Sequence, residues 1–328
     1  AMWELGGHVD ALAVGGPEGA PQSFLAVGVS YMSGQWWTGE VRVLDPTSGA
    51  SSASADAEGV ARGALRAGVP SVAWVGGDVM TGGDDGCIDR WQLSLPGQGS
   101  PAGELQRVDG VEAHEGAVSA LAPQPGAAFF ASAGADGSVC IWDGNQQLKS
   151  PLAELAGHTG AVEGLSWGAG ADPQLASSSV DGTVRVWDSE TSAPALTIGV
   201  SSPAYCVAWS PSSPGVLACG TENGLVETYD TRAPPSAPVA SVKAHGDVVR
   251  AVAFGAGGLA SAGDDGSICL HGAAAAGDKP AARVTPHAQG AYVRALSWAG
   301  GTGSSTLFSG GWDGSVASID TKGLLTES

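Results

Sequence analysis

The feature that most constrains this chain is a tight turn that returns at nearly even intervals. Six segments place Asp-Gly or Asn-Gly between short apolar or alternating runs, and their turn glycines follow one another at intervals of 51, 45, 42, 42 and 48 residues. The turn glycines are Gly86, Gly137, Gly182, Gly224, Gly266 and Gly314. Glycine tolerates a positive φ, so each turn predicts a hairpin between two strands. A period of about 40 to 45 residues with such hairpins is typical of the four-stranded blades of a β-propeller.

The runs around these turns predict the other strands of each blade. An alternating run follows the turn, as in 183–187, and a further apolar run precedes the hairpin, as in 165–167. A first, more divergent repeat has strand-like runs at 24–28 and 40–44, joined by 33–39 in place of Asp-Gly. Counting it, we expect one all-β domain over residues 1–328, a single seven-bladed propeller. The expected blades are roughly 23–62, 70–112, 117–156, 161–199, 204–243, 248–285 and 292–320, with 1–6 added to the last.

The first residues are expected to close the ring. An open propeller would leave strand edges unpaired. Residues 2–5 precede Gly7-His8 just as 152–155 precede Gly157-His158. We therefore expect the N-terminal strand to complete the last blade, so that both termini meet there. Three stretches rich in Ser, Ala and Gly are interpreted as outer strands with long loops, and they are 46–68, 95–103 and 272–280.

A polar quartet recurs with the repeat. Two repeats hold it at nearly the same offsets, as His114, Ser132, Asp136 and Trp142 and as His158, Ser177, Asp181 and Trp187. A hydrolase needs one Ser-His-Asp set, whereas a recurring set indicates architecture. The pattern resembles WD-repeat proteins, in which the quartet forms a hydrogen-bonded chain from Trp to Ser to His to Asp. Such a buried chain is stable only if every member is paired. The expected fold is therefore a seven-bladed WD-repeat β-propeller.

Other repeats keep parts of this quartet. The sixth has His271 at the Trp position and the seventh has Ile319 there, while the fifth has Tyr229 and Asn223. The second has Thr81, Asp85 and Trp91 without an obvious histidine, the sixth also keeps His245, Ser261 and Asp265, and the seventh keeps His287, Ser309 and Asp313. A metal site at His245 and His271 lacks a further ligand.

Several classes of function have no support in the sequence. Phosphate-binding, dinucleotide-binding, zincin and nucleophile-elbow motifs are absent, so we expect no catalytic site, no cofactor and no metal. Propeller enzymes usually concentrate charged groups around the central channel. The inner strands here look apolar and small, with Ala208, Ala253 and Ala260 as examples. No apolar run approaches the roughly 18 residues of a membrane span, and no signal peptide is visible.

The net charge limits the classes of partner that this chain can bind, and its cysteines indicate the compartment in which it works. The net charge is −19, from 14 Lys and Arg against 33 Asp and Glu. This field repels nucleic acid and anionic membranes and attracts basic partners, although it also serves plain solubility. The five cysteines contain no CxxC pair and sit in strand-like runs. We expect buried free thiols and therefore a reducing compartment, the cytoplasm or the nucleus.

Two groups of residues are candidates for partner contacts. Trp36 and Trp37 are neighbours in the first hairpin turn, and neighbours on an extended segment point to opposite faces. At most one packs easily into the blade, and the other anchors a partner or packs against a nearby loop. The residues before the other turns include Asp84, Glu222, Asp264 and Trp312. They are expected on the same face, where they either grip guanidinium groups or are ordinary solvated turn residues.

Several atypical stretches resemble one WD-repeat family, the methylosome WD-repeat subunit. They are Ser33-Gly-Gln-Trp-Trp-Thr-Gly39 and 68–77, together with 202–212, 222–231, 292–299 and 311–313, and the resemblance extends over nearly the whole chain. It implies a non-catalytic propeller, monomeric alone, that binds the N-terminal barrel of a type II protein arginine methyltransferase. The transferase supplies the S-adenosylmethionine chemistry, and the propeller helps to present Arg/Gly-rich substrates such as Sm proteins and histone tails.

The resemblance also suggests which residue anchors the partner. The family's anchoring Trp aligns with Trp37, and Trp36 replaces a less bulky residue. The alternatives are a WD-repeat scaffold of another complex, such as a ubiquitin ligase, a coat or a ribosome-assembly complex, or an acidic histone-binding chaperone.

Overall fold

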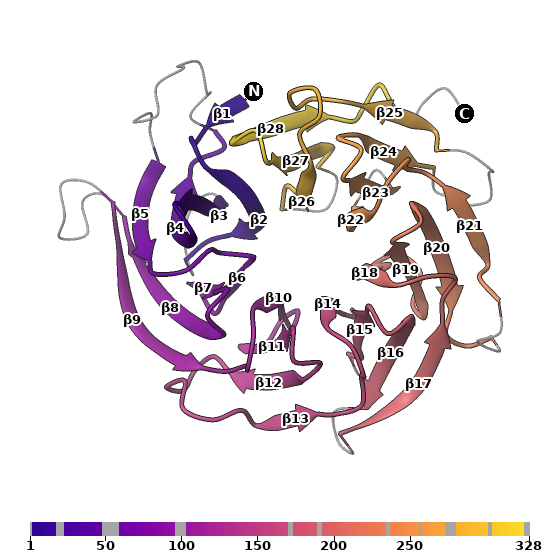
Figure 1. Ribbon diagram of the computed structural model, residues 1–328, viewed down its shortest axis with the longest axis horizontal. Helices are drawn as coiled ribbons and strands as arrows, with labels where there is room; N and C mark the ends of the chain where they lie inside the picture. Colours follow the sequence, from indigo (N-terminus) through magenta and orange to yellow (C-terminus); the bar gives the residue numbers. More distant parts are fainter. Residues whose placement is uncertain are drawn as a thin grey trace.

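The computed structural model describes residues 2–17, 23–47, 59–95, 103–169, 173–188, 192–233, 237–255, 258–272, 280–300 and 304–324. Within these residues 28 strands form seven four-stranded antiparallel sheets. The sheets stand as blades around a central opening (Figure 1). The described residues contain no helix that is long and apolar enough to cross a membrane. The expected seven-bladed β-propeller is confirmed.

Each blade runs from an innermost to an outermost strand. Blade one is β2 (His8–Gly15), β3 (Phe24–Ser33), β4 (Trp36–Leu44) and β5 (Gly59–Leu65), and blade two is β6 (Ser71–Val75), β7 (Asp78–Gly82), β8 (Cys87–Ser94) and β9 (Glu104–Glu112). Blade three is β10 (Val118–Pro123), β11 (Phe129–Gly134), β12 (Val139–Asp143) and β13 (Ala153–Leu155), and blade four is β14 (Val162–Trp167), β15 (Leu175–Ser179), β16 (Thr183–Asp188) and β17 (Ala193–Gly199). Blade five is β18 (Ala204–Trp209), β19 (Val216–Thr221), β20 (Leu225–Asp230) and β21 (Ala240–Lys243), and blade six is β22 (Val249–Gly255), β23 (Gly258–Gly263), β24 (Ile268–His271) and β25 (Ala282–Val284). Blade seven is β26 (Val293–Trp298), β27 (Thr306–Gly311), β28 (Ser315–Asp320) and β1 (Met2–Glu4).

The N-terminal strand closes the ring. Strand β1 pairs antiparallel with β28, with Met2 opposite Ala317 and Trp3 opposite Val316. Blade one begins earlier than the expected residue 23, because β2 at His8–Gly15 is its innermost strand. Every blade needs this strand before its hairpin, and the alternation in His8–Gly15 is weak enough to pass for a linker. Residues 48–58, 96–102 and 273–279 of the expected loops lie outside the described residues.

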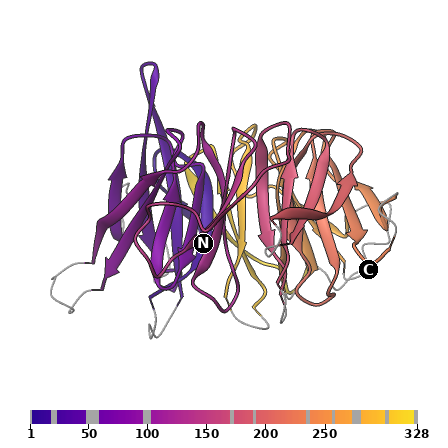
Figure 2. The same cartoon turned by 90° about the horizontal axis from the view of Figure 1, so that it is seen from below.

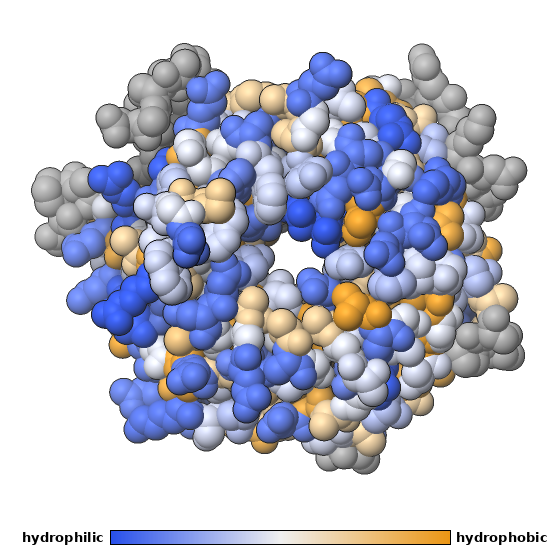
Figure 3. Space-filling model, in the orientation of Figure 1, coloured by the Kyte–Doolittle hydropathy of each residue, from blue (hydrophilic) through white to orange (hydrophobic). Residues whose placement is uncertain are grey.

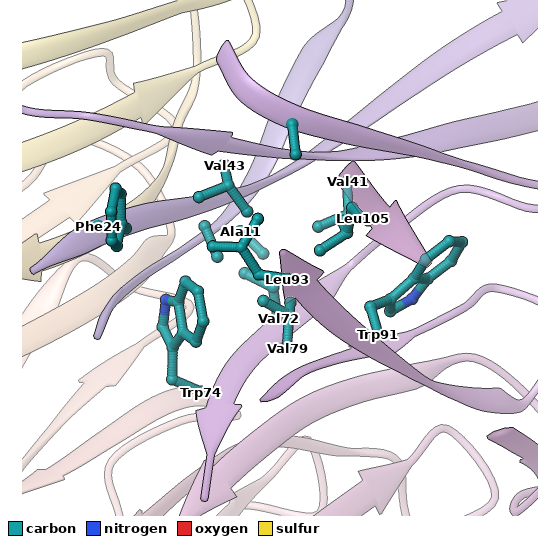
Figure 4. Packing of buried hydrophobic residues seen from close by; sticks show 12 residues of the cluster. Ala11, Phe24, Val41, Val43, Val72, Trp74, Val79, Trp91, Leu93 and Leu105 are labelled. Carbon is teal, nitrogen blue, oxygen red and sulfur yellow. The ribbon is translucent and has the colours of Figure 1, made fainter. Parts of the chain in front are cut away.

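The core lies between neighbouring blades, where sheet packs on sheet. Figure 4 shows the cluster that joins blades one and two, with Phe24 and Val43 facing Trp74 and Trp91. Fully burying a side chain of this size contributes about 1.5 to 3 kcal/mol. A second link is polar, because Trp74 Nε1 donates to the backbone carbonyl of Ala13 in the preceding blade at 3.2 Å. Trp167 and Trp298 repeat this bond to Ala122 and Ala253, each at 3.1 Å.

The cysteines are free thiols within these strands. Cys140, Cys206, Cys219 and Cys269 are buried, and burial raises their pKa values. Cys87 departs from the expectation because its thiol is only half-buried at the start of β8.

Candidate functional site

Hydrogen bonds join both complete quartets in one order. In blade four Trp187 Nε1 donates to Ser177 Oγ at 2.8 Å, Ser177 Oγ lies 2.7 Å from His158 Nε2, and His158 Nδ1 lies 2.8 Å from Asp181. In blade three the corresponding bonds from Trp142 through Ser132 and His114 to Asp136 measure 2.9, 2.7 and 3.4 Å. The serines and the imidazoles are fully buried. A substrate cannot reach these hydroxyls, so the quartets hold the blades together.

Burial and pairing set the charges of these chains. Burial lowers the pKa values of His114 and His158, which keeps both rings neutral near pH 7. Burial alone would raise the pKa of Asp181, but hydrogen bonds from Thr183, His158 and the Thr159 amide hold it at about 2. A neutral ring that donates Nδ1–H to the carboxylate must accept at Nε2. The proton order therefore runs from indole to hydroxyl to imidazole to carboxylate.

Incomplete quartets keep much of this geometry. In blade six His271 occupies the Trp position, with Nε2 2.9 Å from Ser261 Oγ, and His245 bridges Ser261 and Asp265 at 2.9 and 3.0 Å. Blade seven keeps the bonds of His287 to Ser309 and Asp313, with Ile319 at the Trp position of β28. In blade two Trp91 donates to Thr81 at 2.9 Å. In blade five Tyr229 donates instead to the buried Glu227 at 3.0 Å.

The first hairpin projects beyond the other turns. Strand pairing continues to Ser33 opposite Trp36, so the turn itself is Gly34-Gln35, with Gly34 at φ 66°. Both tryptophans therefore lie in β4 rather than in the turn. Figure 2 shows this indigo hairpin standing out from one face of the disc.

The tip of the hairpin exposes large apolar side chains. Trp36 is 77% exposed, Met32 is 65% exposed and Trp37 is 37% exposed. Trp37 turns one edge to the His8 ring, 5.7 Å away between centroids. Neither indole is buried in the blade, so both are open to a partner.

A polar clamp fixes the base of the hairpin. Tyr31 Oη donates to Glu40 Oε1 at 2.6 Å, and Arg42 Nη2 donates to Tyr31 Oη at 2.9 Å and to the Leu5 carbonyl at 3.1 Å. Burial and the Glu40 carboxylate raise the pKa of Tyr31 to about 12. The clamp joins both hairpin strands to the segment that leaves β1, so the tryptophans stand on a supported base.

The four predicted turn residues differ in their surroundings. They occupy the turns between the second and third strands of their blades, the same connection that forms the Trp36 hairpin in blade one. Asp84 and Glu222 are exposed there. Asp264 is nearly buried and pairs with Arg250 and Arg294, while Trp312 lies under the Arg294 guanidinium at 4.6 Å. Two of the four therefore already hold an arginine of this chain.

Charged residues at the channel mouth are missing from the sequence-based expectation. Six innermost strands carry a one-residue β-bulge near their start, and the residues passed over by the pairing are Asp10, Ser119, Glu163, Tyr205, Arg250 and Arg294. We call these six the mouth ring. In five of these blades, the residue two positions before the bulge accepts a backbone hydrogen bond from the turn between the second and third strands. An example is the bond from the Trp312 amide to the Tyr292 carbonyl at 2.9 Å.

Neighbouring members of the mouth ring are joined directly or through Trp312, which lies under Arg294. The Arg250 guanidinium lies over the Tyr205 ring at 4.5 Å, and Trp312 Nε1 donates to Asp10 at 2.7 Å. The central opening is thus bordered by charge on this face, unlike the expected apolar lining, and Ala260 lies in the second strand β23 rather than in an inner strand. A bulge shifts the alternation by one residue, which is why a simple inward–outward pattern misses these side chains.

Comparisons with known proteins agree with the repeat geometry. The family described as WD domain, G-beta repeat matches residues 104–143, 149–188 and 236–271. Each match begins in or near the outer strand of one blade and ends in the third strand of the next. Repeats of this kind overlap two blades, which is also the arrangement that lets β1 close the ring.

Named relatives share parts of the chain. A ribosome biogenesis protein WDR12 homolog from Chlamydomonas reinhardtii is 29% identical over 165 residues, 43% of this chain and 37% of that protein. Human striatin-4 is 30% identical over 128 residues, 36% of this chain and 17% of striatin-4. The histone acetyltransferase type B subunit 2 of Aspergillus fumigatus is 36% identical over 94 residues, 26% of this chain and 21% of that protein.

These matches support the superfamily and go no further. They span well under two thirds of each relative, and none of the three relatives is named as a methylosome subunit. The chain is therefore a seven-bladed β-propeller that contains WD repeats, with the ring closed by its N-terminal strand.

Proposed function

We propose that this propeller is a non-catalytic adaptor that docks on a type II protein arginine methyltransferase and presents basic, Arg/Gly-rich proteins to it. The proposal rests on one observation above all, the projecting β3–β4 hairpin with Trp36, Trp37 and Met32 at its tip. It is supported by the resemblance of residues 33–39 to the anchoring turn of the methylosome subunit.

The hairpin has the physical properties of an anchor. Tryptophan is enriched among the residues that dominate binding energy at interfaces, and an exposed indole gains most when a partner pocket covers it. The clamp of Tyr31, Glu40 and Arg42 holds the strands before binding. Less conformational entropy is then lost when the partner docks.

The charge of the chain suits the second part of the role. At −19 the protein attracts Arg-rich tails, such as those of Sm proteins and histones, and speeds their encounter at low salt. Asp84 and Glu222 are exposed on the face from which the hairpin projects. The transferase supplies the reaction, and we place the complex in the cytoplasm and nucleus.

The test is affinity purification of the full-length protein from its own cells, followed by mass spectrometry. We expect a type II arginine methyltransferase with the wild type, and its loss with Trp37→Ala, Trp36→Ala or both. Val239→Ala is the matched control, because Val239 is also an exposed apolar side chain but lies outside the hairpin, beside β21. It should retain the partner.

Other outcomes would replace the proposal. Recovery of ribosome-assembly factors would favour the role named for the Chlamydomonas relative, and recovery of histones without any transferase would favour a histone-binding chaperone. Retention of the methyltransferase by both Trp variants would keep the partner but remove the hairpin as its anchor.

A further inference from the structure

Two arginines meet at the channel mouth of a chain that has few cations. Arg250 and Arg294 are the mouth-ring residues of β22 and β26, the innermost strands of the neighbouring blades six and seven. On the face shown in Figure 3, a strongly hydrophilic patch borders the central opening where these two strands reach it. Only 14 residues of the whole chain are Lys or Arg, so two of them side by side form an unusual local field.

The two guanidinium groups share one carboxylate. Arg250 Nε lies 2.8 Å from Asp264 Oδ2, and Arg294 Nε lies 3.2 Å from Asp264 Oδ1. The second contact is not aligned as a hydrogen bond, so Arg294 Nε and Asp264 Oδ1 are both buried without one. The Asp264 side chain is only 9% exposed, whereas each arginine side chain is 22% exposed. The Asp264 carboxylate is thus less exposed than the two arginines, and it is the one carboxylate of the described residues that pairs with both of them, while Asp10 and Glu163 act on them at longer range.

Aromatic rings hold the guanidinium groups in place. Arg250 lies over Tyr205 at 4.5 Å, while Arg294 lies over Trp312 at 4.6 Å and over Tyr292 at 5.4 Å. Trp312 is itself fixed by its hydrogen bond to Asp10. The aromatic rings and the carboxylate near each Nε fix the plane of each guanidinium group, the fork of the arginine, before any ligand arrives. This reduces the conformational entropy lost on binding.

The outer nitrogens of both forks remain available. Among the described residues, Arg250 donates its side-chain hydrogen bond through Nε, and no Nη atom of Arg250 or Arg294 donates a hydrogen bond. Two other carboxylates lie in the mouth ring, but Asp10 accepts from Trp312, and neither Asp10 nor Glu163 forms an ion pair with these arginines within the described chain. Burial and the neighbouring Arg250 lower the pKa of Arg294, a cost that a bound anion would offset.

We propose that Arg250 and Arg294 form a receptor for a carboxylate side chain, an Asp or Glu of a partner segment that crosses the channel mouth on the hairpin face. The Nη atoms of both forks donate to its two oxygens. A singly charged carboxylate suits the site better than a phosphate, because Glu163 and Asp10 border it and repel a second negative charge. Tyr292, which is 39% exposed, offers a surface for the apolar neighbours of the acidic residue.

The first experiment selects peptides from a random displayed library on the purified full-length protein. We expect enrichment of Asp or Glu at one fixed position with wild type. The best peptide, resynthesised, should bind at least about tenfold tighter than its Glu→Gln counterpart, the size expected for charge-assisted hydrogen bonds to a fork. Selection of Arg or Lys at that position, or of no preferred residue, would overturn the proposal.

Substitutions test whether the guanidinium groups of Arg250 and Arg294 cause the preference for the Glu peptide over the Gln peptide. Arg250→Gln and Arg294→Gln should each weaken binding of the Glu peptide about tenfold and leave binding of the Gln peptide unchanged. Arg232→Gln is the control, because this exposed arginine pairs with Asp230 in blade five, away from the mouth, and should leave both affinities unchanged. A Glu peptide that binds the mouth variants as tightly as wild type contradicts the assignment.

Two further experiments test whether the shape of the guanidinium group matters beyond its charge, and whether the ligand is a carboxylate or a phosphate. Arg250→Lys keeps the charge and lacks the fork, so it should fold like wild type and still lose part of the preference for Glu over Gln. A matched phosphoserine peptide that binds more tightly than the Glu peptide would contradict the choice of a carboxylate. The proposal does not depend on the methyltransferase, and Trp36→Ala and Trp37→Ala should leave peptide binding at the mouth unchanged.

Discussion

Blades four and six use the same chain of hydrogen bonds but end it with different rings. In blade four Trp187 donates to Ser177, and in blade six His271 takes the equivalent place beside Ser261, at 2.8 and 2.9 Å. His245 donates to Asp265 and accepts from Ser261, so Ser261 must accept from His271 Nε2–H. An imidazole can therefore replace an indole as the terminal donor. It also adds a group that titrates, which an indole never does.

The largest effect is expected when the centre of a chain is removed. His158→Leu leaves the buried Ser177 hydroxyl and the Asp181 carboxylate without their shared partner, and His245→Leu does the same in blade six. Each unsatisfied buried group costs about 1 to 3 kcal/mol, so each variant should lose about 3 kcal/mol of unfolding free energy. Urea unfolding at pH 7.5 measures the loss. A much smaller loss in one blade would mean that its chain is not sealed from water.

The contribution of blade six to stability should depend on pH in a way that the contribution of blade four does not, because His271 titrates and Trp187 does not. Burial lowers the pKa of His271 to about 4, below that of an unfolded histidine near 6.5. Above about pH 6.5 neither state binds the proton. Between pH 6.5 and 4 the unfolded chain binds a proton that the folded chain excludes, so stability falls as the pH drops, by about 3 kcal/mol from this residue.

His271→Gln tests this directly, because the amide can donate to Ser261 but does not titrate. The variant should lose less stability than wild type between pH 7 and pH 4.5, measured by urea unfolding at several pH values. The lowered pKa values of the other four quartet histidines leave a remaining slope in both proteins. Identical slopes in the two proteins would show that His271 is already charged or exposed.

The quartet aspartates contribute to the pH dependence of stability at lower pH than the histidines. Asp181 has a folded pKa of about 2, below its unfolded value near 3.8, so its stabilisation is complete above pH 3.8 and is lost as the pH falls through 2. Asp181→Asn should remove this contribution. Because the Asp181 carboxylate also raises the pKa of His158, the variant should in addition lose more stability than wild type between pH 6.5 and about 4.5. An unchanged slope near pH 6 would contradict the influence of Asp181 on the protonation of His158.

Replacing the terminal rings should have a moderate and similar effect in both blades. Trp187→Phe and His271→Phe keep an aromatic ring but lose the donor to the buried serine, at a cost of about 1 to 2 kcal/mol. Unfolding at pH 7.5, where His271 is neutral, makes the two comparable. A loss confined to Trp187→Phe would show that the imidazole fills its place without stabilising the chain.

The smallest effect on stability is expected at the exposed tryptophans. Trp36→Ala removes a side chain that is 77% exposed, so the unfolding free energy should change by no more than about 0.5 kcal/mol. Loss of partner capture is expected with this substitution, with Trp37→Ala or with both. A loss of stability comparable to that of Trp187→Phe would mean that the hairpin tip packs within this chain.

Much of the fold follows from local chemistry. Gly86 and its equivalents have φ values near +75 to +85°, as tight turns require, and their spacing defines the blades. The start of blade one could not be placed, because His8–Gly15 carries weak alternation and a bulge at Asp10. Among the candidate site residues, the exposure of Trp36 depends on how far the β3–β4 ladder extends, which residue types do not specify. Asp264 and Trp312 looked free because their partner Arg294 lies in another strand.

The sequence by itself determined the repeat, the hairpins and the closing strand, because these depend on residues within one repeat or on the pairing need of an open edge. The order of each quartet followed from the resemblance to WD-repeat proteins. Tertiary structure alone decided what borders the central opening. There, one-residue bulges shift the inward–outward alternation, and residues of neighbouring blades come within contact distance, five with six, six with seven, and seven with one. Such contacts between distant strands are set by how the ring closes and leave no local pattern in the sequence.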